Sequence, residues 1–271
     1  MMRSTGSITD LVEELRREAT NINVPCHSSL FVNVPAGLME YIDRLLSFPP
    51  VDLTLIDKFS VRFKHYDLLR LNSDVWLNDE VVNFCMRLFE ERELMAKAAN
   101  PARKSNFFMN SFFYFKLAQS EGGFNYNNVK RWTKKINVFS YNLIFIPINA
   151  CKHWTMVCVS IPTREIMYLN SLTSLDDDGK AFTRNILMWL RLEFSSKSSS
   201  GAFPDFNAKP VRCPQQLNSF DCGVFILAYA DLLSNELTLD LMMQSLSHGV
   251  RKLVALWIVR GYLVSFPFHL F

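Results

Sequence analysis

The chain has 271 residues, 49% of them hydrophobic, which is enough for one large domain or two small ones around a sizeable core and excludes disorder as the default. Its 29 basic and 26 acidic residues leave a net charge of only +3, without a run of lysines or arginines that would track phosphates, so we expect no nucleic-acid partner. The longest apolar runs, such as Leu253 to Val259, are too short to cross a membrane, and residues 1–7 lack the apolar stretch of a signal peptide.

The cysteines favour free thiols in a reducing compartment. They are scattered, with no Cys-x-x-Cys pair and no metal-like Cys/His spacing. Three disulfides are the alternative for an even count, but the chain is large and its start does not resemble a secretion signal. The six are Cys26, Cys85, Cys151, Cys158, Cys213 and Cys222.

Residues 1–50 form a segment in which we find no chemistry. Ser7 to Arg17 has the spacing of a short amphipathic helix, with acidic residues early and basic residues late, as the helix dipole prefers. Gly37 to Leu46 predicts a second helix that stops before Phe48-Pro49-Pro50. We interpret residues 1–50 as a helical extension or a partner-binding arm, and residues 51–271 as the domain that carries the function.

That domain opens with short strands and one strong helix. Val51 to Phe63 alternates loosely and favours one or two short strands, and His65 to Leu71 predicts a helical turn. Asn78 or Asp79 is a good N-cap for a helix that runs to about Ala98 with apolar residues at helical spacing.

Five further segments have patterns that predict core, helix or strand. The aromatic-rich stretch Phe107 to Leu117 is predicted to be core, and the polar stretch Asn127 to Lys135 to be helical. Lys180 to Phe194 and Leu239 to Val259 predict two helices, and Lys209 to Cys213 a strand.

Three strands with hairpin-length connections are predicted at Leu143 to Ile148, His153 to Ile161 and Ile166 to Asn170. His153 begins one strand and Asn170 ends the next. If these strands pair antiparallel, the two residues meet at the same edge of the sheet, so their juxtaposition is a geometric expectation.

The stretch Cys213 to Phe225 passes from a polar, turn-prone segment to Cys222 at the start of the apolar run Val224 to Ala230, which predicts a buried helix. Asp221 or Ser219 is a candidate cap. A thiol in the first turn of a helix loses its proton more readily, and the thiolate is the nucleophile.

Cys222 has two interpretations. Free cysteines are often buried structural residues. Its surroundings favour catalysis, because the Gln216 amide lies on the approach to the same helix, where it can donate to a developing oxyanion. His153, followed by Trp154, can supply a base.

These residues, in this order, resemble the Ulp1/SENP cysteine proteases of ubiquitin-like modifiers, in which a histidine, a carboxylate or amide, a glutamine and a cysteine follow one another. Residues 76–79 resemble the family's Trp-Leu-Asn-Asp signature. Residues 214–223 resemble its Pro-Gln-Gln-x-Asn-Gly-x-Asp-Cys-Gly motif. The resemblance runs from about residue 52 to residue 265. It implies an α+β, papain-like fold with a central, mostly antiparallel sheet packed by helices.

Two residues depart from the family pattern. The usual Asp-Ser-Leu is replaced here by Asn170-Ser171-Leu172, and this change affects a candidate catalytic residue. The usual glycine before the aromatic residue of the cysteine motif is Ser219, at a turn that favours positive φ.

The resemblance implies a role for each catalytic candidate. Cys222 would be the nucleophile, His153 its general base, Asn170 the residue that accepts from the imidazole and orients it, and Gln216 the oxyanion donor. Papain-like proteases use an asparagine in this way, so Asn170 is compatible with activity.

It also implies a substrate path. Trp76 and Trp154 would roof a narrow tunnel over the modifier's C-terminal Gly-Gly, since two flat indoles admit only a chain without side chains; both are otherwise ordinary core residues. Asp79 would pair with a basic residue of the modifier, or it caps its helix.

The implied activity is cleavage after the Gly-Gly of SUMO or a relative, in precursor processing or deconjugation from lysine. Another modifier, as for a deneddylase, and an inactive fold that only binds the modifier are the alternatives, the last suggested by Asn170. The resemblance implies that the protein needs no cofactor or metal and that its partners are the modifier and its conjugates. It further implies an intracellular monomer in the nucleus or cytoplasm, without nucleic-acid or membrane partners.

Overall fold

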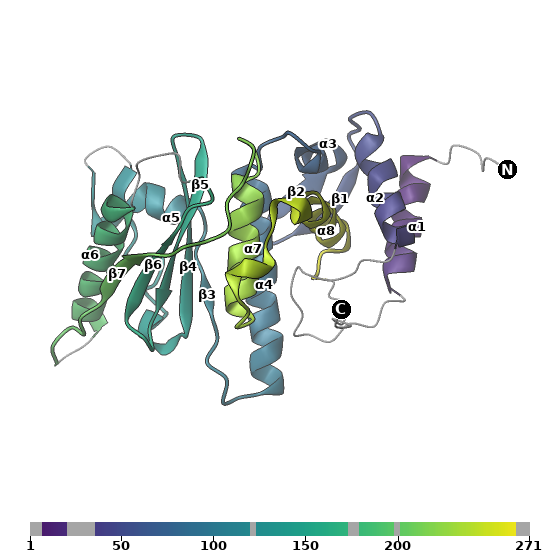
Figure 1. Cartoon of the computed structure of the whole chain (residues 1–271). Coiled ribbons are helices and arrows are strands. Elements are labelled where there is room, and N and C mark those ends of the chain that lie inside the picture. Colours follow the sequence, from purple (N-terminus) through teal and green to yellow (C-terminus); the bar gives the residue numbers. More distant parts are fainter. Residues whose placement is uncertain (1–6, 21–35, 120–122, 173–178, 198–200, 264–271) are drawn as a thin grey trace.

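The computed structural model describes residues 7–20, 36–119, 123–172, 179–197 and 201–263 (Figure 1). The helices in these ranges are α1 (Ile8–Thr20), α2 (Ala36–Ser47), α3 (His65–Leu68), α4 (Asp79–Ala99), α5 (Phe112–Tyr114), α6 (Lys180–Lys197), α7 (Cys222–Ser234) and α8 (Ser247–Arg260). The strands are β1 (Thr54–Lys58), β2 (Val61–Lys64), β3 (Phe107–Phe108), β4 (Leu143–Ala150), β5 (His153–Ser160), β6 (Glu165–Leu169) and β7 (Asn207–Pro210).

The central sheet has the order β3-β4-β5-β6-β7. Its three long strands form the predicted antiparallel meander, with Ala150 opposite His153 and Met156 opposite Leu169. The two short edge strands, β3 and β7, join it in parallel, so the sheet is mixed, and its long strands are antiparallel as predicted. Because β5 begins at the edge where β6 ends, His153 and the residue after Leu169 share that edge, as the sequence predicts.

The two faces of the sheet are covered by different helices (Figure 1). Side chains alternate along a strand, so Ile144 and Ile146 of β4 pack in a cluster with residues of α6, including Trp189. Phe145 between them and Met156 of β5 pack in a second cluster with α4, α7 and α8. Both clusters are apolar, and the sheet is therefore buried on both sides.

Helix α7 lies against the sheet and is buried along almost its whole length. The sequence explains this, because Val224 to Ala230 is apolar all round, which is the pattern of a helix without a solvent-facing side. Helices α4 and α8 pack on it. The first residue of α7 is Cys222, which this packing holds at the margin of the sheet.

The N-terminal helices α1 and α2 pack on each other and on α8. Leu15 of α1 and Ile42 of α2 are fully buried in the same cluster as α7 and α8. Lys252 of α8 donates to Asp43 of α2 across 2.7 Å, and Arg16 of α1 donates to the Val259 carbonyl at 3.3 Å. The two helices therefore contribute to the core of the described structure.

Three predicted helices or strands differ in kind or in bounds from those in the structure. Asn127 to Lys135 is not a helix but a short 3₁₀ turn, η3 (Tyr126–Asn128), followed by further turns, whose Thr133 carbonyl accepts from Lys197 of α6. The helix predicted from Leu239 begins only at Ser247, after two 3₁₀ turns, η5 (Leu239–Leu241) and η6 (Gln244–Leu246). Strand β7 ends at Pro210, earlier than the predicted Cys213.

The aromatic stretch Phe107 to Leu117 is only partly core. Phe108 and Phe113 are buried, whereas Phe112 and Phe115 are exposed. Within the described ranges, no helix has the length and apolar character needed to cross a membrane.

Candidate active site

Cys222 begins α7 with its side chain 1% exposed. Burial raises the pKa of this thiol, while hydrogen bonds from the backbone N–H groups of Trp154, Gly223 and Cys222 itself act in the opposite direction. Desolvation, the larger effect, therefore opposes the easier loss of the proton that the helix start favours. Burial thus favours the neutral thiol, and a base is needed to take its proton.

The bond from the Trp154 backbone brings the start of β5 to the thiol. His153 is the preceding residue, so the predicted base and the predicted nucleophile are neighbours across this bond. Among the described residues, no hydrogen bond joins the Cys222 thiol to the His153 ring directly. Such contacts are often long in free enzymes and tighten when substrate binds.

His153 and Asn170 meet as the sequence predicts. His153 Nε2 lies 2.8 Å from Asn170 Oδ1. The same oxygen accepts the backbone N–H of Leu172 at 3.0 Å. Because a backbone N–H can only donate, this contact identifies the atom facing the ring as the amide oxygen, and Nε2 must carry a proton to donate to it. In the neutral ring Nδ1 is then free to accept one.

The main chain of Asn170 is fixed as well. Its carbonyl oxygen accepts from the Cys213 thiol at 3.1 Å and from the Gln215 side-chain amide at 3.0 Å. These contacts attach the end of β6 to the segment that leads to Cys222. Cys213, which burial leaves with a raised thiol pKa, is thus part of the support for the histidine and not a second nucleophile.

Gln216 is buried beside that segment with its amide orientation defined. Its Oε1 accepts the Ser171 hydroxyl at 2.7 Å, and its Nε2 donates to the Asn218 carbonyl at 2.6 Å. The backbone N–H of Gln216 donates to the Ser171 carbonyl at 2.8 Å. An amide NH₂ has two hydrogens, so Nε2 retains one for a further acceptor.

The two tryptophans differ. Trp76 is 47% exposed, and its Nε1 donates to the Ser219 carbonyl at 2.8 Å. Trp154 is 2% exposed, and its Nε1 donates to the Leu77 carbonyl at 2.9 Å. Both indoles are thus anchored around the cysteine segment, but only Trp76 offers a free face in this structure.

Asp79 does not cap α4. That cap is Asn78, whose Oδ1 accepts the Val81 N–H at 3.2 Å. Asp79 instead accepts the Ser111 hydroxyl at 2.6 Å and remains partly exposed. Asp221 occupies the cap position of α7, yet its side chain makes no capping bond, contrary to one of the two predicted caps.

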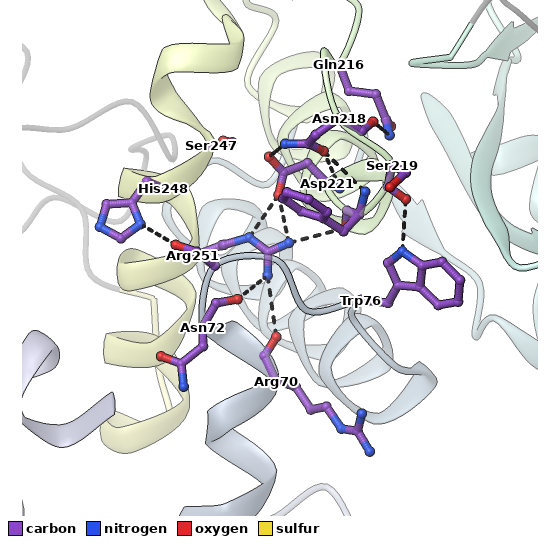
Figure 2. A network of polar contacts seen from close by, with 12 residues as sticks. Arg70, Asn72, Trp76, Gln216, Asn218, Ser219, Asp221, Ser247, His248 and Arg251 are labelled. Atoms are coloured by element: carbon purple, nitrogen blue, oxygen red, sulfur yellow. Dashed lines mark hydrogen bonds and ion pairs between the residues drawn. The ribbon is translucent and has the colours of Figure 1, made fainter. Parts of the chain in front are cut away.

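Figure 2 shows where the Asp221 carboxylate goes instead: it meets Arg251 of α8. Arg251, and Ser171 beside Asn170, were not predicted as site residues. Arg251 is followed directly by Lys252 at the start of an apolar run, so the sequence alone does not show which of the two charges is buried and paired. Five cysteines lie in the described ranges and all are free, as predicted: Cys85, Cys151, Cys158, Cys213 and Cys222.

The sequence matches the Ulp1 protease family, C-terminal catalytic domain, over residues 75–255. It is 35% identical over 199 residues to Sentrin-specific protease 2 of Rattus norvegicus, covering 72% of this chain and 32% of that protein. It is 34% identical over 177 residues to the Arabidopsis thaliana ubiquitin-like-specific protease ESD4, covering 62% and 34%. The chain thus spans about a third of the length of these curated relatives.

Solved structures share the fold. The SUMO protease Ulp1 with its catalytic cysteine oxidised to a sulfinic acid superposes with a TM-score of 0.71 at 24% identity, over 86% of this chain and 98% of that one. The C-terminal Ulp1 protease domain in complex with Smt3, the yeast ortholog of SUMO, gives 0.69 at 23% identity, over 83% and 95%. The predicted Ulp1-type α+β fold is confirmed.

Proposed function

The chain belongs to the Ulp1 protease family, and we propose that it is a cysteine protease that cleaves after the C-terminal Gly-Gly of SUMO or a related ubiquitin-like modifier. The observation that carries the proposal is the His153–Asn170 contact of 2.8 Å at the sheet edge that also reaches Cys222. A nucleophile, a base and a residue that orients the base are the components that acyl transfer requires.

The tautomer supports a base role for His153. With Nε2–H donated to Asn170, Nδ1 accepts the proton of the Cys222 thiol as Sγ attacks the carbonyl carbon of the terminal glycine. The imidazolium then protonates the leaving amine, and the acyl group remains on sulfur as a thioester. Water, deprotonated by the same histidine, hydrolyses the thioester and restores the thiol.

Gln216 fits the oxyanion donor. Its free Nε2–H is held in place because Ser171 fixes the opposite end of the amide. A pre-oriented donor stabilises the charge that develops on the carbonyl oxygen without reorganising during the reaction.

The substrate path depends on Trp76 and Trp154. We assign the exposed indole of Trp76 to the modifier's C-terminal segment, and the buried Trp154 to the floor of the same path. Substrates ending in Gly-Ala are then cut more slowly than those ending in Gly-Gly, and Trp76→Ala loses most activity on both. Asp79, half exposed and held by Ser111, is assigned to a basic residue of the modifier.

A modifier-binding protein without activity is the second candidate, favoured by the burial of the Cys222 thiol. A SUMO probe ending in an aldehyde or vinyl sulfone separates the two. The protease captures it covalently at Cys222, whereas a binder gives no adduct. A panel of modifier–coumarin substrates, including SUMO and NEDD8 forms, then identifies the modifier, and processing of none of them overturns the proposed activity.

The remaining assignments rest on the family and on composition. Residues 51–271 are assigned to catalysis and residues 1–50 to a helical extension. The protein acts as a monomer in the nucleus or cytoplasm, in keeping with five free thiols in the described ranges. Fractionation of cells that express a tagged chain tests the location.

A further inference from the structure

Arg251 of α8 is 1% exposed and uses all of its donors (Figure 2). Its Nε and Nη2 donate to Asp221 Oδ1 at 2.9 and 2.7 Å. Nη2 also donates to the Phe220 carbonyl at 3.2 Å. Nη1 donates to the carbonyls of Arg70 and Asn72 at 3.4 and 3.1 Å. A guanidinium has five N–H groups, so each one has an acceptor.

The carboxylate that Arg251 meets is satisfied on its other oxygen too. Asp221 Oδ2 accepts from the side-chain amides of Asn218 and Gln244, each at 2.8 Å. Gln244 in turn accepts the backbone N–H of Leu217 at 2.8 Å through its Oε1. The segment before Cys222 is therefore held by side chains of η6 and α8 and not by its own helix cap.

The carbonyls of Arg70 and Asn72 belong to a different part of the chain. They precede Trp76, the indole assigned to the substrate path, and Trp76 Nε1 makes a second tie to the Ser219 carbonyl. One guanidinium thus joins the segment that carries the nucleophile to the segment that carries the exposed indole. Figure 2 shows both segments converging on it.

Charge gives Arg251 a second effect. Asp221 directly precedes Cys222, and its negative charge raises the pKa of the thiol. Among the described residues, Asp221 is the charged group that acts on the thiol directly. Arg251 of α8 pairs with Asp221, and His153 of β5 is the predicted base, whereas Gln244 and Asn170 are neutral. Arg251 offsets the nearest negative charge, and it does so within a buried site where screening by solvent is weak.

We infer that Arg251 is a positioning residue of the active site: it fixes the Phe220–Asp221 segment against the Arg70–Asn72 segment and neutralises Asp221 beside the nucleophile. The inference rests on the proposed function only where it concerns the effect of Arg251 on turnover. The effect of Arg251 on the reactivity of the Cys222 thiol does not require any substrate. No partner or modification is needed for either effect.

The test uses the full chain with Cys151→Ser, which removes the exposed thiol of the described ranges, and Cys26→Ser. Alkylation of Cys222 by iodoacetamide is followed against pH by mass spectrometry, and kcat and KM are measured with a SUMO–coumarin substrate. In Arg251→Met the alkylation midpoint moves to higher pH, because Asp221 is ionised where thiols titrate, and kcat/KM falls at least about tenfold, or about 1.4 kcal/mol. Arg251→Lys keeps the positive charge, so it retains the parental alkylation midpoint. It loses contacts with the backbone carbonyls, so it raises KM.

The matched control is Arg92→Met, which breaks a buried Arg–Asp pair at the other end of the same helix. It changes neither the alkylation midpoint nor KM. The inference is overturned if Arg92→Met also raises the alkylation midpoint and lowers kcat/KM. It is likewise overturned if a folded Arg251→Met keeps the parental midpoint and kcat/KM.

Asp221→Asn keeps the test decisive if Arg251→Met does not fold. It removes the negative charge and leaves Arg251 on both carbonyls, so the midpoint moves to lower pH while KM is retained; a midpoint that stays or rises overturns the inference. If no modifier is processed but the midpoints move as stated, the proposed function fails and the role of Arg251 stands.

Discussion

Both ends of helix α7 have a buried Arg–Asp ion pair, but the surroundings of the two pairs differ. Each end has a buried aspartate paired with an arginine from another helix: Asp221 with Arg251 of α8, and Asp231 with Arg92 of α4. A carboxylate is favoured at a helix N-terminus and disfavoured near its C-terminus. Arg92 therefore compensates an unfavourable charge, whereas Arg251 neutralises a carboxylate that the helix itself tolerates.

The acceptors of the two arginines show what the difference means. Arg92 Nη2 donates to the Ser234 hydroxyl at 2.6 Å, within the last turn of α7, so this contact and the one with Asp231 lie inside the core. Arg251 reaches backbone carbonyls in the Arg70–Asn72 segment and in the cysteine segment. We conclude that the C-terminal pair maintains packing and the N-terminal pair maintains the geometry of a site.

The largest effect is expected at the N-terminal end. Cys222→Ser should lower turnover by at least about 10³-fold, because a hydroxyl is a far poorer nucleophile than a thiol. Binding of the modifier should stay within a few-fold, since it spreads over a broad interface. Modifier–coumarin hydrolysis and calorimetry measure the two. Comparable hydrolysis by the serine variant would remove Cys222 from the role of nucleophile.

The next effect belongs to the C-terminal end and falls on stability. Arg92→Met should lower the free energy of unfolding by about 3–5 kcal/mol, because it removes the arginine that faces the buried Asp231 carboxylate. Urea denaturation measures this loss. The kcat/KM of the remaining folded protein should be parental, and a loss of activity beyond the loss of folded protein would contradict the separation of the two ends.

A smaller effect is expected at the second residue of α7. A Cβ at Gly223 would lie 2.9 Å from the Leu77 Cβ. Gly223→Ala should therefore cost about 1–3 kcal/mol by overpacking. Gly249→Ala, near the start of α8 with no atom within 4 Å of the new Cβ, is the control and should gain up to about 1 kcal/mol. Equal melting temperatures for the two variants would exclude the close packing at Gly223.

Asn170 supports the N-terminal end through His153. Asn170→Ala should lower kcat/KM at least about tenfold, the scale of losing about 1.4 kcal/mol of hydrogen bonding and orientation. Asn170→Asp should keep or raise activity and extend it to higher pH, because a carboxylate stabilises the imidazolium. A pH–rate profile of each variant measures both. If Asn170→Ala matches the parent, Asn170 is not the third residue, and the aspartates at 176–178 are tested next.

The smallest expected effect is a loss of folding stability at acid pH, caused by protonation of Asp221. Burial acts to raise the pKa of Asp221, but hydrogen bonds from Asn218, Arg251, Gln244 and Ser247 lower it below its usual value. Since the folded pKa lies below the unfolded value of about 3.9, the stabilisation is present above that pH and is lost as pH falls through the folded pKa. Denaturation below pH 4 should therefore be steeper for the parent than for Asp221→Asn. Parallel curves would contradict the lowered pKa.

Local patterns predicted much of this structure. The apolar run after Cys222 predicted α7, and hairpin-length connections predicted that His153 meets Asn170. Both depend on periodicity and on chain neighbours, which the sequence displays directly. The N-cap at Asn78 was predictable for the same reason.

Long-range packing accounts for what was missed. The raised thiol pKa of Cys222 follows from burial by elements distant in the chain, and a helix-dipole argument does not include them. The Asp221–Arg251 pair joins residues 30 positions apart, so a capping rule placed the aspartate correctly but assigned it the wrong partner. The burial of Trp154 likewise depends on the Leu77 carbonyl of another segment.

The packing of α1 and α2 on α8 has a practical consequence. A shortened chain starting at residue 51 would expose part of α8 to water. It would also lack Arg16 and Asp43, which bind the Val259 carbonyl and the Lys252 ammonium of α8. Because α8 also bears Arg251, such a truncation would loosen the support of Cys222 from more than one side of the molecule. A chain that starts at residue 51 is therefore expected to be less stable and less active than the full chain, and urea denaturation with an activity assay of both measures the difference.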